Sequence, residues 1–233
     1  MEDSAPSLKP QPASNLFITE QPALAPLLQQ VACLLGPVAN HESELFSEER
    51  PAIERAVQKR RNEFSSGRHF AHLLLDSLAL PRQAIPQGRR RAPAWPGGVL
   101  GSISHSNTLA WVALTHAGRD IRGLGIDVEA RQRLPAELHE RLFTAAETAA
   151  IDERGTDFAT WLFTAKESIY KATEPLAGAF IGFAEAECRF DAGGRVFTVS
   201  YLGDHAPSSV MERGIGVVKQ DNEHVYALFV IPD

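Results

Sequence analysis

The segment that most constrains the fold of this chain is Leu124–Glu129, which reads LGIDVE. Its apolar residues are typical of a buried strand, yet it carries two carboxylates, Asp127 and Glu129. Side chains two residues apart on a strand point to the same face, roughly 6 to 7 Å from each other. Two buried carboxylates repel each other and are costly unless a cation or strong donors compensate them. The segment therefore predicts a strand beside a cation site.

A helix over residues 157–173 supplies the next candidate groups. Its apolar stripe with helical spacing consists of Trp161, Leu162, Ala165, Ile169 and Ala172. Beside this stripe, Glu167 and Lys171 lie one turn apart and point the same way. Such a pair is also a common feature of exposed helices. Next to the strand carboxylates, however, Glu167 would complete an oxygen-rich site suited to Mg²⁺, and Lys171 would hold a phosphate bound there.

The order of predicted elements is the same in both parts of the chain, helix followed by strands. In the first part a helical pattern begins at Pro51 and is expected to break or kink at Ser65–Gly67. Two strands are expected on either side of Ser106-Asn107. In the second part, helices near 136–143, 145–153 and 157–173 precede four strands, AECRFD, RVFTVSYL, GIGVVKQ and HVYALFVI.

These elements predict an α+β fold of two similar pseudo-symmetric α+β halves, residues 1–121 and 122–233, with the active site between them. Residues 1–20 are expected to form a loose leader without the features of a secretory signal, which predicts a cytoplasmic protein. No apolar run approaches the ~20 residues of a membrane span, and Leu24–Val38 is expected to be a short helix. The net charge of −6 argues against a nucleic-acid partner.

Several motifs together resemble those of the single-chain 4'-phosphopantetheinyl transferases, the type that activates surfactin and enterobactin synthetases. GIDVE and WLFTAKESIYKA resemble the paired signature of that family, and KRRNEFSSGRHFAHLLL and GVLGSISHS are similar to its two upstream motifs. TAAETAAI resembles the acidic segment between the main motifs. The matches run in the family's order from about Arg60 to Phe183, which makes them more specific than any single motif.

The resemblance implies an enzyme that moves the phosphopantetheine arm of coenzyme A to a serine of an apo carrier protein and releases 3',5'-ADP. Asp127, Glu129 and Glu167 match the positions that hold Mg²⁺. Glu167 also matches a residue proposed to take the serine proton, and Lys171 matches the lysine that neutralises the diphosphate. Glu147 matches a position sometimes assigned as the base, although a glutamate on a helix surface explains it equally well.

Other residues match positions that contact coenzyme A. Arg60 and Arg68 match two arginines near the 3'-phosphate, a task that suits the fixed fork of guanidinium donors. Ser104 and His105 match a pair at a strand end that also contacts phosphate. The remaining matches are a basic residue, either Arg90 or Arg91, and an aromatic one along the pantetheine arm, Phe180.

Two other functions are compatible with the sequence. One is a different Mg²⁺-dependent phosphoryl-transfer enzyme, although a two-metal site would need more clustered ligands than this sequence offers. The other is a non-catalytic module that binds coenzyme A or a carrier protein, which would not need a lysine at the reacting phosphate. For the transferase, the expected partners are apo acyl carrier proteins or peptidyl or aryl carrier domains. A monomer is expected, with no membrane partner.

Overall fold

The computed structural model describes residues 9–17, 21–118, 120–131, 134–177, 181–204 and 208–233, which contain two antiparallel sheets. The first sheet has the order β1-β2-β4-β3, with β1 at Gln11–Pro12, β2 at Ala32–Pro37, β3 at Val99–His105 and β4 at Leu109–His116. The second has the order β5-β9-β8-β7-β6, with β5 at Ile121–Ala130, β6 at Ala186–Phe190, β7 at Val196–Tyr201, β8 at Ile215–Gln220 and β9 at His224–Pro232.

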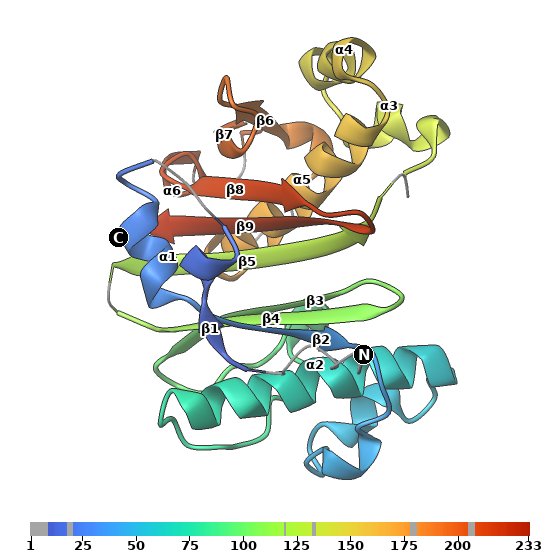
Figure 1. Ribbon diagram of the computed structural model, residues 1–233, viewed down its shortest axis with the longest axis vertical. Coiled ribbons are helices and arrows are strands. Elements are labelled where there is room, and N and C mark those ends of the chain that lie inside the picture. The colour runs from blue at the N-terminus through green and yellow to red at the C-terminus, as the bar shows by residue number, and fades with distance from the viewer. Residues whose placement is uncertain (1–8, 18–20, 119, 132–133, 178–180, 205–207) are drawn as a thin grey trace, which may run out of the picture.

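One long helix packs on each sheet (Figure 1). The α-helices are α1 at Ala25–Gln30, α2 at Gln58–Ser77, α3 at His139–Leu142, α4 at Ala145–Arg154, α5 at Asp157–Ala177 and α6 at Ser208–Met211. The short 3-10 turns are η1 at Ala13–Asn15, η2 at Glu42–Glu44, η3 at Arg50–Ile53, η4 at Arg89–Arg91, η5 at Ala136–Leu138 and η6 at Phe183–Glu185. Helix α2 covers the first sheet and α5 the second, so the predicted α+β fold of two similar halves is confirmed.

The two sheets pack against each other through a shared apolar core that includes Trp111 of β4 and Ile126 and Val128 of β5. The alternate residues of β5 face α5 instead. A Cβ atom on Gly125 would lie 1.9 Å from the carbonyl oxygen of Ser168, which is too close for any side chain. Gly125 therefore lets α5 approach β5 closely, and the carboxylates that follow it on the same face point toward that helix.

Helix α2 runs without a break from Gln58 to Ser77, so the predicted break at Ser65–Gly67 is wrong. Small residues occupy this part of α2 because neighbouring segments approach it. A Cβ atom on Gly67 would lie 2.8 Å from Cγ2 of Ile103 in β3. The Ser66 hydroxyl accepts a hydrogen bond from the Ala39 backbone N–H at 2.9 Å. These small residues allow close packing and do not interrupt the helix.

The N-terminal region is more ordered than the sequence predicted. Residues 24–38 form both α1 and β2, because β2 pairs with β4 from a distant part of the sequence. The expectation of a loose leader does not hold for residues 11–17, since β1 pairs with β2 and Phe17 is buried beside Trp111, with ring centroids 5.9 Å apart. We propose that the two halves of the chain meet between residues 121 and 122, at the start of β5.

None of the helices that the structure describes is long and apolar enough to span a membrane. Both cysteines, Cys33 and Cys188, are buried free thiols, and burial raises the pKa of each thiol.

Candidate active site

Side chains from three elements meet where the two halves join. Lys171 of α5 donates hydrogen bonds from Nζ to Oδ1 of Asp127 at 2.7 Å and to Oγ of Ser104 at 3.1 Å. The Ser104 hydroxyl in turn donates to the same Asp127 oxygen at 2.6 Å. Asp127 and Ser104 are buried, whereas a quarter of the Lys171 side chain is exposed. Lys171 also lines a cleft, so it lies at the edge of the buried cluster.

Three carboxylates act electrostatically on this ammonium group. Burial works against the charged form of Lys171, but Asp127, Glu167 and Glu129 together raise its pKa above the ordinary value. Glu129 shares a face of β5 with Asp127, and Glu167 lies one turn before Lys171 on α5. The charges of the three residues predicted to hold a metal ion thus all act on this ammonium group, but their carboxylate oxygens do not all lie within 4.8 Å of one another.

Two serines of β3, Ser102 and Ser104, form hydrogen bonds to the backbone of β5. The hydroxyl oxygen of Ser102 accepts a hydrogen bond from the Ile126 N–H at 3.1 Å, and that of Ser104 accepts one from the Val128 N–H at 3.3 Å. These bonds join the edge strands of two different sheets. They also fix the Ser104 hydroxyl beside Asp127.

A second polar cluster lies at the end of β3. His105 Nε2 lies 2.6 Å from Nη1 of Arg60, which comes from the first turn of α2. Glu63, one turn further along α2, lies 3.5 Å from the Arg60 guanidinium and 3.7 Å from His105 Nδ1. Burial lowers the pKa of His105, and the Arg60 and Lys171 charges lower it further, while Glu63 opposes them. Arg60 and His105, which were predicted to contact the same end of coenzyme A, do lie together.

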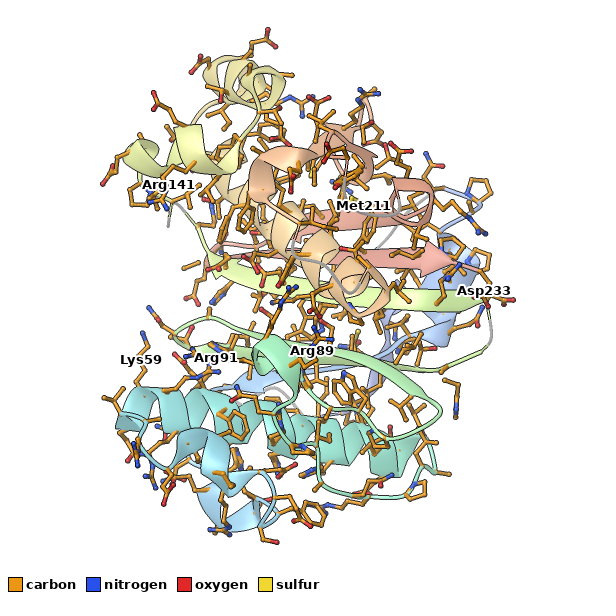
Figure 2. The ribbon with its side chains drawn as sticks, turned by 180° about the vertical axis from the view of Figure 1, so that it is seen from behind. Lys59, Arg89, Arg91, Arg141, Met211 and Asp233 are labelled. Carbon is orange, nitrogen blue, oxygen red and sulfur yellow. The ribbon has the colours of Figure 1, made fainter. Side chains whose placement is uncertain are left out.

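A cleft of about 560 Å³ opens between the halves next to these clusters. It is lined by the η4 loop, the middle of β3, the start of β5 and the exposed side of α5, including Glu167 and Lys171. Figure 2 shows Arg89 and Arg91 of the η4 loop at the level of the junction between the halves. The cleft therefore combines the η4 arginines of the first half with Glu167, Lys171 and Glu174 of the second, whereas Asp127 and Glu129 do not line it.

Two arginines of the η4 loop, Arg90 and Arg91, line the cleft from left-handed backbone positions. Arg90 and Arg91 both have left-handed backbones, with φ of 48° and 68°. Nη1 of Arg90 lies 3.4 Å from Oε1 of Glu174 on α5, so this side chain bridges the two halves. Both arginines line the cleft, and the choice between them as the predicted ligand contact stays open.

Of the two remaining predicted residues, one is buried and the other cannot be placed. Arg68 is buried in the first half, where its Nε–H donates to the Ile85 carbonyl at 2.6 Å and its guanidinium lies 4.3 Å from the centre of the Phe64 ring. This leaves its terminal nitrogens as the groups that could bind a ligand. Phe180 lies outside the described residues.

Glu147 is neither an exposed helix residue nor part of the cleft. Its carboxylate is buried and ion-paired with buried Lys166 at 2.6 Å. It also accepts hydrogen bonds from the backbone N–H groups of Thr144 at 2.9 Å, in a capping box that begins α4, and of Cys188 at 2.8 Å. With both oxygens engaged in this way, Glu147 has a structural role.

A model of the 4'-phosphopantetheinyl transferase N-terminal domain matches residues 48–115, and a model of the 4'-phosphopantetheinyl transferase superfamily matches residues 123–228. The chain belongs to the 4'-phosphopantetheinyl transferase superfamily. It is a transferase that moves the phosphopantetheine group of coenzyme A to a carrier protein, as the sequence motifs predicted.

Similar phosphopantetheinyl transferases come from several bacteria. The 4'-phosphopantetheinyl transferase Svp of Streptomyces mobaraensis is 39% identical over 69% of this chain and 67% of its own length. PptT of Mycobacterium tuberculosis is 36% identical over 66% of this chain and 69% of its own length. A holo-(acyl-carrier-protein) synthase of Bacillus anthracis, solved in complex with CoA (3',5'-ADP), gives a TM-score of 0.40 and 24% identity over 49% of this chain and 99% of that chain.

The structure adds two residues of this phosphopantetheinyl transferase that the sequence analysis missed. Lys166 occupies the buried stripe of α5, between Leu162 and Ile169, and a lysine at such a position signals a buried carboxylate partner. Glu63 follows Arg60 at the spacing of a helical ion pair, which is also visible in the sequence. Helical spacing indicated the Arg60–Glu63 pair, whereas the partner of Lys166, Glu147, comes from another helix.

Proposed function

We propose that this transferase acts in the cleft between its halves, with Mg²⁺, on a serine of an apo acyl carrier protein or of a peptidyl or aryl carrier domain. The observation that carries the proposal is the position of Lys171 Nζ, 2.7 Å from Asp127 and at the edge of a cleft. A cation there, with carboxylates around it and basic groups across the cleft, suits the diphosphate of coenzyme A.

The residues that would hold Mg²⁺ are Asp127, Glu129 and Glu167. Their fit is supported by Oδ2 of Asp127, which is buried and has no hydrogen-bond partner among the residues that the structure describes. A buried carboxylate oxygen without a donor is stabilised by a cation. When bound, Mg²⁺ would neutralise and orient the diphosphate.

We assign the proton transfer to Glu167. It lines the cleft, whereas Glu147 is held by Lys166 and two backbone N–H groups away from it. In the proposed reaction, the serine oxygen bonds to the phosphorus of the phosphopantetheine arm, its proton passes to Glu167, and the bond to 3',5'-ADP breaks. Lys171 would neutralise the oxygen that leaves.

The basic groups of the first half would hold the other end of coenzyme A. Arg60, Arg68 and His105 are proposed to contact the 3'-phosphate, with Arg90 or Arg91 on the remaining phosphates. Guanidinium groups offer paired donors that match phosphate oxygens. A monomeric state and a cytoplasmic location stay predictions from the sequence.

The reaction is tested by mass spectrometry of an apo acyl carrier protein incubated with this protein, coenzyme A and Mg²⁺. A gain of one phosphopantetheine group on the carrier is expected, and it should disappear when a chelator removes Mg²⁺. Binding of coenzyme A without any gain of mass, for acyl, peptidyl and aryl carriers alike, would instead indicate a binding module.

Replacing Asp127 with Ala should lower turnover at limiting Mg²⁺ at least about tenfold, because one metal ligand is lost. The fold should survive, since the carboxylates that remain repel one another less when no cation is bound. Activity as a function of Mg²⁺ concentration checks this, with circular dichroism to confirm folding. Normal activity of the variant at limiting Mg²⁺ would make Asp127 a purely structural residue.

Replacing Arg60 with Ala should weaken binding of coenzyme A more than binding of dephospho-coenzyme A, because only the former carries the 3'-phosphate. Arg61 provides a matched control, since it is adjacent on α2 and is ion-paired with Glu42. Arg61→Ala should leave the ratio of the two affinities unchanged. Isothermal titration with both ligands measures that ratio, and equal losses for Arg60→Ala would place the 3'-phosphate elsewhere.

A further inference from the structure

Three side chains with metal-binding donor atoms lie together on the first half of the molecule. His41 precedes η2, Glu44 ends it, and His69 comes from α2. Nδ1 of His41 is 2.8 Å from one oxygen of Glu44, and Nδ1 of His69 is 2.7 Å from the other. One donor atom from each residue lies within 4.8 Å of the other two. None of the three lines the cleft between the halves.

The surrounding structure holds this cluster in place. The His41 backbone N–H donates to Oγ of Ser65 on α2 at 3.1 Å, which fixes the segment before η2 against that helix. The two imidazole rings are stacked, with centroids 4.0 Å apart and planes 6° apart. Both rings are largely buried, while Glu44 is more exposed, with 41% of its side chain accessible. The three side chains thus already lie close together, although the stacked rings do not yet point at a common position.

The contact between His69 and Glu44 is close but poorly aligned for a hydrogen bond. Its Nδ1 atom is buried and has no hydrogen bond of acceptable geometry to any residue in the described part of the chain, although a carboxylate oxygen lies 2.7 Å away. A buried polar atom without a hydrogen bond is uncommon and calls for an explanation. A cation shared by His69, Glu44 and His41 would satisfy this atom.

We propose that His41, Glu44 and His69 bind one divalent transition-metal ion, with Zn²⁺ as the best match. Two imidazoles and a carboxylate are a donor set that Zn²⁺ uses, and water would complete its tetrahedral shell. Mg²⁺ prefers six oxygen ligands and does not suit these nitrogens. Because the rings are parallel, binding needs a rotation of at least one ring so that both nitrogen lone pairs meet at the ion.

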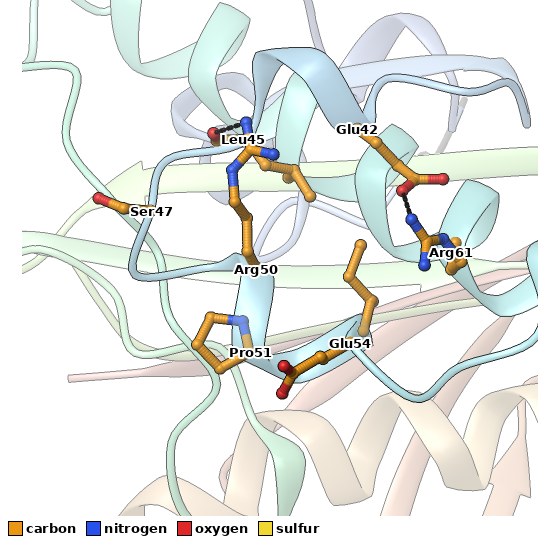
Figure 3. A pocket seen from close by; sticks show the side chains of 8 residues that line it. Glu42, Leu45, Ser47, Arg50, Pro51, Glu54 and Arg61 are labelled. Atoms are coloured by element: carbon orange, nitrogen blue, oxygen red, sulfur yellow. Dashed lines mark hydrogen bonds and ion pairs between the residues drawn. The ribbon is translucent and has the colours of Figure 1, made fainter.

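Such an ion would tie η2 to α2 and stabilise the first half independently of the cleft. The pocket next to it offers no comparable ligand set (Figure 3). In that pocket Arg61 pairs with Glu42, and Arg50 donates to the Leu45 carbonyl at 3.1 Å, so three of its charged or polar groups already have partners.

The test uses the untagged full-length protein, freed of metal and then kept in excess Mg²⁺ so that the cleft carboxylates are occupied. Titration with Zn²⁺ should show one equivalent bound and a rise in melting temperature. Titration with Co²⁺ should give the visible absorption of a tetrahedral site with nitrogen ligands. Absence of bound Zn²⁺ in the wild-type protein would overturn the proposal.

Variants locate the bound ion. His41→Ala and His69→Ala should each weaken Zn²⁺ binding at least about tenfold. Loss of a group that only hydrogen-bonds to a metal ligand already costs about this much, and these residues would be ligands themselves. Glu44→Gln keeps the size and polarity of an exposed side chain, so it should fold normally and still lose affinity. His116→Ala is the control. His116 ends β4, whereas the other end of the strand, Leu109, pairs with Pro37 near the His41 segment. This variant should bind Zn²⁺ normally. Unchanged binding by Glu44→Gln or by both histidine variants would contradict the site.

Discussion

Lys171→Ala should lower the rate constant of carrier-protein modification at least about 100-fold, with a much smaller change in affinity for coenzyme A. The reason is that negative charge grows on the leaving diphosphate oxygen as the reaction proceeds, so the ammonium group stabilises the transition state more than the bound substrate. Loss of one such donor typically costs about 2.7 to 4 kcal/mol of transition-state stabilisation. Single-turnover kinetics with saturating coenzyme A measures the rate constant directly.

The same variant makes a second, separable prediction about stability. Without Lys171, the buried carboxylate of Asp127 loses its ion-pair partner, so the melting temperature should fall in metal-free buffer. Added Mg²⁺ should restore most of the lost melting temperature, because the cation replaces the lost positive charge. Lys219→Ala, a lysine on β8 that packs over the Tyr226 ring, serves as the control and should leave the rate unchanged. Normal turnover by Lys171→Ala would remove Lys171 from the reaction.

Lys166→Met should destabilise the fold by about 3 to 5 kcal/mol, since it leaves the Glu147 charge buried without its partner. Both side chains are almost completely inaccessible, at 1% and 2% exposure. Lys166 also donates to the carbonyls of Leu142 at 2.9 Å and Phe183 at 2.7 Å, so it joins α3, α4 and η6 to α5. Urea unfolding followed by circular dichroism gives the free energy of unfolding.

A double-mutant cycle with Glu147→Gln separates the ion pair from the packing. If the pair is responsible, the double variant should be clearly more stable than the sum of the two single losses predicts. The exposed pair of Arg189 with Glu187 at 3.3 Å is the matched control, and Arg189→Met should cost no more than about 1 kcal/mol. A loss that small for Lys166→Met would mean that the Glu147 charge is compensated in another way.

Local patterns in the sequence predicted the elements that carry the site. The apolar residues around Asp127 predicted β5, and the stripe beside Glu167 predicted α5, because each pattern depends only on its own stretch of the chain. The small residues at Ser65–Gly67 were misread as a break, since the same composition also suits close packing. Whether a small residue ends a helix or admits a neighbour depends on what lies beside it, and Ile103 comes from a distant strand.

By itself, the sequence determined that this chain has a strand with paired carboxylates, a helix with Glu167 and Lys171 on one side, and the motifs of its family. Only the tertiary structure decided which groups pair. Helical spacing offered Glu167 as the partner of Lys171, whereas in the fold the ammonium group bonds to Asp127 and Ser104. The tertiary structure likewise paired Glu147 with Lys166. The physical reason is that ion pairs depend on distance in space, and the close approach of α5 to β5 at Gly125 is set by packing between segments far apart in the sequence.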